Sequence, residues 1–447
     1  MNYEQSVGGL IALGRELASP QQARVMKFDL ANIRALAEGM GNPQRAMPCA
    51  HIAGTNGKGS TAAMLESILR RAGIRTGLYT SPHLERINER IRINGEEVAD
   101  DVFAAAWTRV QKTVEELLAK GKLAAHPSFF ECVTAMGFLI FAEQKAEFAV
   151  YEVGLGGRLD ATNIVEPQVA MITPVDFDHE SFLGHSIEEI AGEKAGIIKH
   201  GVPVVSAAQR PEAASVIQRR AQEADAPLTF IPDVWVVNDV THADGLYRVV
   251  AERPDTGEKF SIAPSLPGRF QIDNALMAAT AAQLLQQTGL SITREAVVDG
   301  IRKAQWPGRL EQLQDKPLVY LDGAHNPSAA RELAKFWVEN FAGRRIWLVY
   351  GAMRDKAVDE IAGVLFPLVH RVILTEPLQL RAVSAQVLAE MTADLTQSVS
   401  VVPDPSQALE EAISQAARED VIFASGSLFL VGDLHKYWHS RATVRAG

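Results

Sequence analysis

Hydrophobic residues in the first half of the chain form short apolar runs, and the segments between them have helical periodicity. In one such segment Leu65, Ile68 and Leu69 share a helical face, and Gly73 ends the pattern. Helices are expected at 61–73, 100–121 and 130–146, and apolar strands at 49–54, 75–81, 147–154, 168–175 and 201–208. Strands without polar alternation, separated by helices, indicate a mostly parallel, doubly wound α/β sheet covered on both faces.

The pattern changes twice further along the chain. Residues 228–263 contain turns at Asp244-Gly245 and Asp255-Thr256-Gly257, which predict a small antiparallel patch, and a helix is expected at 274–289. Strand–helix alternation restarts near residue 304 and predicts a second, Rossmann-like α/β unit of ordinary domain size. We therefore expect one domain at 1–303, which includes the antiparallel patch, and another at 304–447, with a hinge near 300–310.

Composition excludes several classes of protein. Hydrophobic residues make up 47% of the 447 residues and charged residues 22%, which is typical of a globular chain. A net charge of −10 argues against nucleic acid as the main partner. The two cysteines, Cys49 and Cys132, fit a reducing compartment. The N-terminus lacks the pattern of a signal peptide and the run at 132–142 is too short to span a bilayer. We expect a cytoplasmic protein that is not membrane-bound.

The stretch GTNGKGS, residues 54–60, joins the first predicted strand to the first predicted helix. Glycines let backbone N–H groups converge on a phosphate there, the helix N-terminus favours an anion, and Lys58 can reach the outer phosphates. Ser60 or Thr61 can then face a magnesium ion. The generic P-loop pattern has glycine where Ile52 stands and no residue where Gly59 stands. A purely structural glycine turn therefore stays open as the alternative.

Acidic and histidine residues follow the next two strands, where open α/β sheets bind ligands. Glu152 ends the strand at 147–154, and it either holds a metal or pairs with Arg158. After the strand at 168–175 come Asp176, Asp178, His179 and Glu180. They either supply metal ligands or form an ordinary solvated loop. Magnesium prefers oxygen, so His179 is an unusual ligand for it.

Two further positions have both a structural and a functional interpretation, and a third segment holds two more candidates. Lys194, in GEKAGIIK, is either a surface charge or a buried functional amine. Arg309 lies at the expected hinge, and it either forms a structural ion pair or contacts phosphate when the domains close. Asp322 and His325 lie in a strand-to-helix turn of the second unit.

Seven motifs, in this order, together resemble one family over nearly the whole chain: GTNGKGS, SPHL, EVGLGGRLDATN, DHESFLG, EKAGIIK, PGR and DGAHNP. The set is highly specific for the folylpolyglutamate synthases and dihydrofolate synthases, a branch of the Mur ligase superfamily. The resemblance implies a P-loop-type ATP-binding domain and a C-terminal domain that close around the substrates. The family's phosphate loop also carries the extra glycine, so Gly59 fits it.

The resemblance implies a role for each motif residue. The triphosphate and nucleotide would be held by Thr55, Asn56, Gly57, Lys58, Gly59, Ser60, Asn274, Arg309 and Asp322. Two magnesium ions are implied, with Ser81, Glu152 and His179 as ligands and a carbamylated Lys194 beside them. His325, and with weaker support Ser425 or Ser427, would lie near the incoming glutamate; Lys58, Lys194 and His325 would be catalytic.

The resemblance also implies where a pterin acceptor binds. The matching positions are Lys27, Phe28, Asp29, Leu30, Ser128, Phe129, Leu159, Asp160 and Ala161. Phe129 either stacks on the flat ring or packs in the core ahead of a buried helix. Ala31 and Asn32 stand where the family often has glycine. The acceptor therefore stays open between dihydropteroate and tetrahydrofolate.

The implied reaction is ATP-dependent amide formation between a folate-type carboxylate and L-glutamate, through an acyl phosphate, by a monomer. Two alternatives remain. A UDP-muramyl peptide ligase is disfavoured by EVGLGGRLDATN and by the lack of a separate UDP-binding N-terminal domain. A nucleotide-dependent binding protein that forms no amide would not need the second α/β unit that carries DGAHNP.

Overall fold

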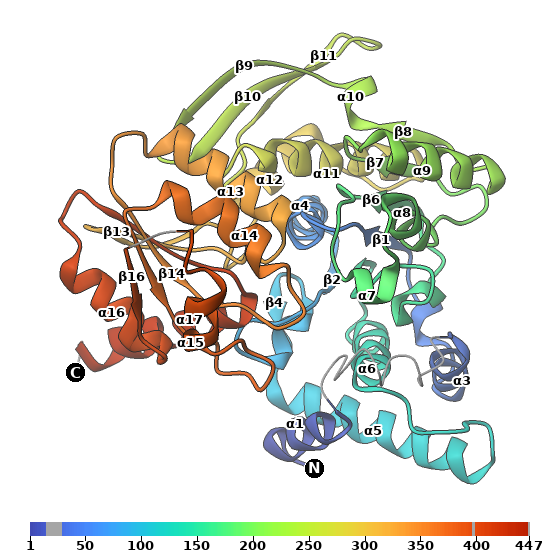
Figure 1. Cartoon of the computed structure of the whole chain (residues 1–447). Coiled ribbons are helices and arrows are strands. Elements are labelled where there is room, and N and C mark those ends of the chain that lie inside the picture. The colour runs from blue at the N-terminus through green and yellow to red at the C-terminus, as the bar shows by residue number, and fades with distance from the viewer. Residues whose placement is uncertain (15–28, 396–397, 446–447) are drawn as a thin grey trace.

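The structure is a computed structural model that describes residues 1–14, 29–395 and 398–445 (Figure 1). Its strands form a sheet of eight, a sheet of six and a separate sheet of three. The eight-stranded sheet belongs to the first half of the chain, and the six-stranded sheet lies beside it in the orange and red part of Figure 1. The α/β class predicted from the apolar runs is confirmed.

The eight-stranded sheet has the order β4-β3-β2-β5-β1-β6-β7-β8. Pairing is parallel from β2 to β8, and β3 and β4 add an antiparallel edge that the apolar pattern does not predict. The strands are β1 (Cys49–Ala53), β2 (Thr76–Tyr79), β3 (Ile91–Ile93), β4 (Glu96–Glu97), β5 (Phe148–Glu152), β6 (Val169–Ile172), β7 (Val204–Ser206) and β8 (Leu228–Phe230).

Alternate residues of the central strands enter two different cores, as the period of two in a strand requires. Ala50 and Ile52 of β1 pack with helices α4 (Lys58–Arg71), α11 (Phe270–Gln287) and α12 (Arg294–Lys303). Cys49 and Ala53 point to the opposite face. That face is covered by α1 (Tyr3–Ala12), α3 (Ala31–Gly39), α5 (Asp100–Ala119), α6 (Phe129–Glu143), α7 (Glu180–Leu183), α8 (Ile187–Ala195) and α9 (Pro211–Glu223).

The small antiparallel sheet consists of β9 (Val236–Ala243), β10 (Leu246–Arg253) and β11 (Glu258–Ile262). Asp244 and Gly245 join the first two strands with φ of 51° and 75°, the two left-handed residues that a tight hairpin favours. The predicted start at 228 is wrong. Residues 228–230 are β8, which pairs parallel with β7 after the α9 crossover, and α10 (Ile231–Val234) leads into the patch.

The six-stranded sheet has the order β12-β13-β17-β14-β15-β16 and is parallel except for β12, which pairs antiparallel with β13. Its strands are β12 (Glu311–Asp315), β13 (Leu318–Leu321), β14 (Ile346–Tyr350), β15 (Arg371–Leu374), β16 (Val399–Val401) and β17 (Val421–Ser425). The helices are α13 (Pro327–Asn340), α14 (Val358–Leu365), α15 (Ala385–Met391), α16 (Pro405–Gln415) and α17 (Leu428–Arg445). Cores lie on both faces of this sheet.

Two helices begin earlier than the apolar pattern predicts. Helix α4 begins at Lys58 because Gly57, at φ 86°, takes the N-cap position inside the glycine turn. Helix α11 begins at Phe270, one turn before the predicted 274.

Among the helices of the described segments, none is both long and apolar enough to cross a bilayer.

Candidate active site

The glycine turn after β1 has a backbone that only glycine fits at two positions. Gly54 has φ 147°, and a Cβ there would overlap the Thr173 side chain. Gly57 has φ 86°, and a Cβ there would lie 2.5 Å from Oδ1 of Asn274. No side chain caps α4 at Gly57. The free N–H groups of its first turn are therefore available to an anion.

Two lysine ammonium groups converge on this turn. Lys58 Nζ donates to the carbonyl oxygens of Gly54 and Thr55, both at 3.1 Å, and Lys194 Nζ donates to the Gly54 carbonyl at 2.8 Å. Lys194 is 3% exposed, so its interpretation as a surface charge is wrong. Burial, with Lys58 nearby, lowers the pKa of Lys194 to about 7. Burial also lowers the pKa of Lys58, while Glu152 and Asp178 oppose that effect. A negative ligand would relieve this concentration of positive charge.

Glu152 lies at the C-terminal end of β5, next to the glycine turn of β1. Its side chain is buried, and one carboxylate oxygen accepts a hydrogen bond from the Ser81 backbone N–H at 3.1 Å. Burial raises the pKa of Glu152, and Lys58 lowers it. The alternative pairing with Arg158 is wrong, because Arg158 pairs with Glu193 at 2.7 Å. Glu152 thus presents a buried carboxylate beside the turn.

The loop after β6 brings Asp178 to residues of the second α/β unit. Its carboxylate lies 2.7 Å from Lys356 Nζ, 3.3 Å from Asn326 Nδ2 and 3.6 Å from His325 Nε2. His179 Nε2 is 3.8 Å from the same carboxylate and 3.3 Å from Lys356 Nζ. The lysine and histidine contacts hold the pKa of Asp178 well below its usual range against the effect of burial. These contacts contradict the interpretation of the loop as merely solvated.

The glycine turn also contacts the second unit directly. Asn56 and Asn326 exchange two hydrogen bonds, at 3.2 Å and 2.9 Å. Asn326 is at the same time the N-cap of α13, where Oδ1 accepts from the Ala329 N–H at 2.9 Å. On the other side, Thr55 Oγ1 donates to the carbonyl of Asp176 at 2.9 Å. The turn is therefore connected both to the loop after β6 and to the DGAHNP turn.

Helix α11 supports the first turn of α4. Gln271 Nε2 donates to Ser60 Oγ at 3.4 Å, and Thr61 Oγ1 donates to Asn274 Oδ1 at 3.3 Å. Gly59, which precedes these two residues of α4, must be small because of a neighbour from another part of the chain. A Cβ there would lie 2.7 Å from Nε1 of Trp306, in the segment between the two units. The extra glycine thus leaves room for an indole that packs on the phosphate turn.

Arg309 and Asp322 lie together where the second unit begins. Asp322 is buried and accepts hydrogen bonds from the N–H groups of Leu310, at 3.0 Å, and Ala324, at 2.9 Å. Burial raises the pKa of Asp322, and Arg309 lowers it. The Arg309 guanidinium passes so close to Gly323 that a Cβ there would overlap it.

The second unit contributes three further candidate residues, which are His325, Ser425 and Ser427. His325 Nδ1 donates to the Gly323 carbonyl at 2.7 Å, which leaves Nε2 directed toward Asp178. Ser425 and Ser427 are buried at the end of β17. Ser425 Oγ lies 3.4 Å from the Ala324 carbonyl, and Ser427 Oγ accepts from the Phe429 N–H at 3.1 Å.

The proposed acceptor positions differ in how exposed they are. Lys27 and Phe28 lie outside the described residues. Asp29 is exposed, and its carboxylate accepts from the Ala31 N–H at 2.8 Å. Leu30 packs against the core that contains α5 and α6. Leu159 is half-buried and Ala161 is buried.

Three acceptor positions have structural partners that explain them without a ligand. Ser128 is the N-cap of α6 and forms a capping box with Glu131. Phe129 is 7% exposed within the core, and the Arg90 guanidinium lies 5.4 Å from its ring centroid. Core packing is therefore the better interpretation of Phe129. Asp160 accepts from the N–H groups of Gly154 and Leu155, both at 3.0 Å, and so holds the glycine loop.

Four residues of the site lie outside the positions that the resemblance assigns: Asp178, Trp306, Asn326 and Lys356. Asn326 belongs to the DGAHNP motif, in which the resemblance assigns it no role, and Asp178 belongs to DHESFLG, where it is only one of several acidic candidates. Lys356 comes soon after β14, where the rule that ligands bind beyond the C-terminal ends of parallel strands would have pointed to it. Trp306 has no local sequence feature that predicts its contact with Gly59.

Comparison with known proteins agrees with this architecture. Residues 52–282 match the model of the Mur ligase middle domain, and residues 308–428 match that of the Mur ligase glutamate ligase domain. The dihydrofolate synthase/folylpolyglutamate synthase of Bacillus subtilis is 37% identical over 423 residues, which cover 92% of this chain and 95% of that protein. The corresponding Mycobacterium tuberculosis protein is 36% identical over 374 residues, 80% of this chain and 76% of its own.

Solved structures show the same likeness. A Mycobacterium tuberculosis folylpolyglutamate synthase, in complexes with ADP and AMPPCP, superposes with a TM-score of 0.85 at 32% identity, covering 92% of this chain and 95% of its own. Escherichia coli FolC, in complex with DHPP and ADP, gives a TM-score of 0.85 at 28% identity and covers 99% of both chains.

The paired α/β units and the phosphate turn between them define an ATP-dependent ligase of the Mur type. Within that class, the chain belongs to the dihydrofolate synthase/folylpolyglutamate synthase family.

Proposed function

We propose that the protein joins L-glutamate to a folate-type carboxylate, with ATP as the energy source and an acyl phosphate as intermediate. The observation that carries this proposal is the convergence of Lys58 and Lys194 on the Gly54 carbonyl, beside a turn that is hydrogen-bonded to the second unit through Asn56 and Asn326. A phosphate turn that contacts a second α/β unit suits a reaction that needs two substrates and ATP in one closed space.

ATP would take the place of the carbonyl partners that Lys58 has in the structure. The N–H groups of the first turn of α4 would bind the β- and γ-phosphates, together with Thr55, Asn56, Gly57, Lys58, Gly59 and Ser60. Asn274, Arg309 and Asp322 would contact the rest of the nucleotide. The low exposure of this region strengthens each of these electrostatic contacts.

Glu152 is the residue whose surroundings fit a magnesium ligand best. Glu152 is a buried carboxylate whose accepted hydrogen bond comes from a neutral N–H, and its raised pKa reflects how unfavourable an unbalanced charge is there. With the Ser81 hydroxyl and His179 it would hold one ion, and a modified Lys194 would help to hold a second. Magnesium would neutralise charge on the phosphates during transfer.

Lys194 fits the proposed carbamylation. A neutral amine reacts with CO₂, forming an N–C bond and releasing one proton, and the product carries a carboxylate. The pKa of about 7 means that a large share of the Lys194 amine is neutral at physiological pH, and the Lys58 ammonium lies near enough to stabilise the new negative charge. The modified side chain would supply an oxygen ligand where the unmodified one presents a buried cation.

The chemistry then has two steps. A carboxylate oxygen of the acceptor attacks the γ-phosphorus of ATP, and ADP leaves. The amine of glutamate attacks the acyl carbon, phosphate leaves, and the amine loses a proton. Lys58 and Arg309 would balance charge on the phosphates, and His325 would lie near the glutamate, with Ser425 or Ser427 beside it. Closure of the two units protects the acyl phosphate from water.

Dihydropteroate and tetrahydrofolate are both proposed as acceptors, with a monofunctional folylpolyglutamate synthase as the narrower alternative. The buried Phe129 leaves the flat-ring contact to other residues of the acceptor site. We further propose that the division between the domains falls at 303/304. A cytoplasmic monomer that binds neither nucleic acid nor membrane stays a prediction.

The experiment measures ADP and the amide product with purified protein, ATP, Mg²⁺ and L-glutamate. Four parallel reactions contain dihydropteroate, tetrahydrofolate, a UDP-muramyl peptide or no acceptor. We expect ADP and a glutamyl product in stoichiometric amounts with at least one pterin acceptor, and Lys58→Ala should abolish both. ADP release that is independent of the acceptor, or a product only with the UDP-muramyl peptide, would refute the proposal. Nucleotide binding without turnover would favour a binding protein.

A further inference from the structure

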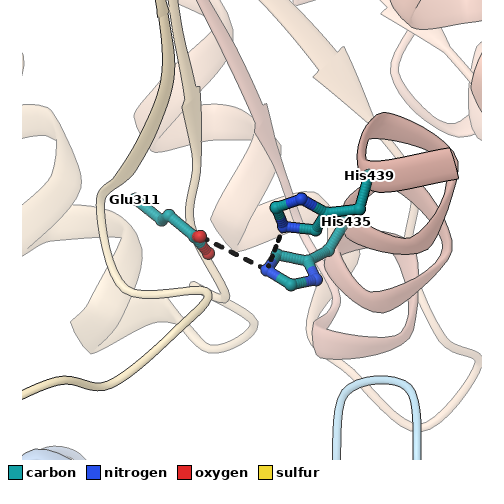
Figure 2. A group of neighbouring side chains, drawn as sticks. All are labelled: Glu311, His435 and His439. Carbon is teal, nitrogen blue, oxygen red and sulfur yellow. Dashed lines mark hydrogen bonds and ion pairs between the residues drawn. The ribbon is translucent and has the colours of Figure 1, made fainter. Parts of the chain in front are cut away.

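Two histidines of α17 and one glutamate of β12 form a cluster that contains no residue of the phosphate turn (Figure 2). His435 and His439 are four residues apart, so they lie on one face of the helix in successive turns. The Glu311 carboxylate faces them from the first strand of the second unit, as Figure 2 shows. One ligand atom from each of the three residues lies within 4.8 Å of the others.

Two separations within this cluster match those between ligands of one metal ion. Nε2 of His439 lies 3.1 Å from Nε2 of His435, which in turn lies 3.3 Å from a carboxylate oxygen of Glu311. Two ligands at about 2.05 Å from a tetrahedral zinc ion are separated by about 3.3 Å. Two of the three separations therefore match those of a tetrahedral site, and the third, between His439 and Glu311, lies within 4.8 Å.

A second carboxylate orients the central imidazole. His435 Nδ1 is hydrogen-bonded to Glu85, which belongs to the segment between β2 and β3 of the first unit. Histidine ligands of metals commonly donate their other ring N–H to a carboxylate, which fixes the tautomer and raises the basicity of the ligand nitrogen. Glu311 is also oriented, because its other oxygen accepts from the Gly308 N–H at 2.8 Å. The side chains of Glu85, Glu311 and His435 are each no more than 25% exposed.

We propose that His435, His439 and Glu311 form a site for a divalent transition metal of the zinc type, with Glu85 as the carboxylate that positions His435. Two imidazoles and one carboxylate are ligands for Zn²⁺, Co²⁺ or Ni²⁺ and not for magnesium, which selects oxygen. The site is thus chemically distinct from the magnesium positions proposed beside the phosphate turn.

A metal bound at this site would strengthen the contact between the two units. Glu85 comes from the first unit, whereas the three ligands come from the second, so a bound metal strengthens a contact between the two. The Gly308 N–H that orients Glu311 precedes Arg309, the residue proposed to contact the nucleotide. Occupancy of the site therefore stabilises both the turn that carries Arg309 and the contact between the units.

A proton is the competing occupant of the same cluster. Glu311, and then Glu85, raise the pKa of His435 to about 9, so a metal has to displace a proton from this ring. The 3.1 Å separation of the two imidazole nitrogens is also that of a hydrogen bond. Metal titration distinguishes the two occupants directly, because a cluster held together only by protons binds no metal tightly.

The test is titration of untagged, chelator-stripped full-length protein with Zn²⁺ at pH 8, with ADP and Mg²⁺ saturating the nucleotide site. Isothermal calorimetry should give one equivalent of Zn²⁺ with a Kd in the micromolar range or below. His439→Ala should weaken this equivalent at least 100-fold. Glu85→Gln, which keeps all three ligands, should weaken it about 10-fold or more. The exposed His200 provides the matched control, and His200→Ala should bind Zn²⁺ as the parent does.

Two controls keep the result interpretable. Circular dichroism confirms that each variant is folded, and Co²⁺ titration should give the visible absorption of a tetrahedral nitrogen–oxygen site in the parent and not in His439→Ala. The proposal is overturned if the parent binds no Zn²⁺ below about 100 µM. It is also overturned if His439→Ala retains the same tight equivalent, since the metal would then lie elsewhere. Neither outcome depends on catalysis, so neither bears on the proposed ligase activity.

Discussion

Asn56 in the phosphate turn and Asn326 at the start of α13 hold each other through two side-chain hydrogen bonds, although 270 positions separate them in the chain. Each amide both donates and accepts. This reciprocal pair connects the turn proposed to bind ATP directly to the second unit.

Replacement of Asn326 by Asp separates the two roles of this residue. The carboxylate still caps α13, but it has no N–H for Asn56 and adds charge beside Asp178. We expect kcat/KM for ATP to fall at least 10-fold, because the turn loses a hydrogen bond of about 1 kcal/mol and gains charge repulsion beside Asp178. The melting temperature should fall by a few degrees at most, because a loss of this size shifts it little in a chain this large. Steady-state kinetics and thermal unfolding measure the two effects.

Asn326→Ala is the companion variant, and it should lose about 1 kcal/mol of stability in addition, through the lost cap. Unchanged kinetics in Asn326→Asp would mean that the interdomain pair has no part in catalysis.

Gly57 offers a test of the turn's backbone. Gly57→Ala imposes a left-handed φ on an L-residue and brings its Cβ to 2.5 Å from Asn274 Oδ1. We expect a loss of stability of about 1–2 kcal/mol and a larger loss of activity, because the N–H groups of the turn move. Gly363 of α14 is the control, since its Cβ would meet no atom within 4 Å and alanine should stabilise the helix by about 0.5–1 kcal/mol. Equal effects at both positions would contradict this account of the turn.

Lys194 provides a test of the buried amine. Lys194→Ala should reduce kcat far more than a change at an exposed lysine such as Lys112, and short carboxylates should restore part of the activity. The pKa of about 7 lies below the ordinary value for lysine, so the neutral amine that reacts with CO₂ becomes more abundant as the pH rises through 7. Preincubation with bicarbonate at pH 8 should therefore activate a CO₂-depleted enzyme more than preincubation at pH 6. An unmodified Lys194 in the fully active enzyme, measured by intact mass, would exclude carbamylation.

The cysteines should be inert in the folded protein. Cys49 and Cys132 are both at most 1% exposed, and burial raises the pKa of Cys49 to about 12 and that of Cys132 further still. The reactive thiolate is therefore almost absent at pH 8. A chromogenic disulfide reagent should label neither thiol within minutes, and both after unfolding in urea. Rapid labelling of the native chain would show that these core positions open easily.

The fold was predictable wherever burial alone determined the pattern. The uninterrupted apolar runs at β1, β5 and β6 indicated strands covered on both faces, and the structure buries all of them. Residues 228–230 were assigned to the wrong sheet, because a three-residue strand carries too little pattern to show which sheet it joins. The antiparallel pairing of β12 with β13 was missed for a different reason, because β12 has one apolar residue, Leu313, among polar ones and so lacks the pattern of a buried strand.

Site residues were predictable from the sequence where the local backbone conformation allows one residue type only. Gly57 has a left-handed φ, and a glycine turn between strand and helix is visible in the sequence itself. The Lys356–Asp178 ion pair and the Trp306 contact with Gly59 depend on how the two units meet, which no local pattern encodes. For Phe129 the sequence left ring stacking and core packing both open, and its position in the core favours packing.

The central claim is that the acceptor carboxylate is activated as an acyl phosphate, and transfer of oxygen-18 tests it most directly. The acceptor is labelled in both carboxylate oxygens, and the phosphate formed with ATP and L-glutamate is analysed by mass spectrometry. We expect one labelled oxygen in each phosphate released per amide formed, because the oxygen that attacks phosphorus leaves with it. Unlabelled phosphate alongside stoichiometric amide would show that no acyl phosphate forms.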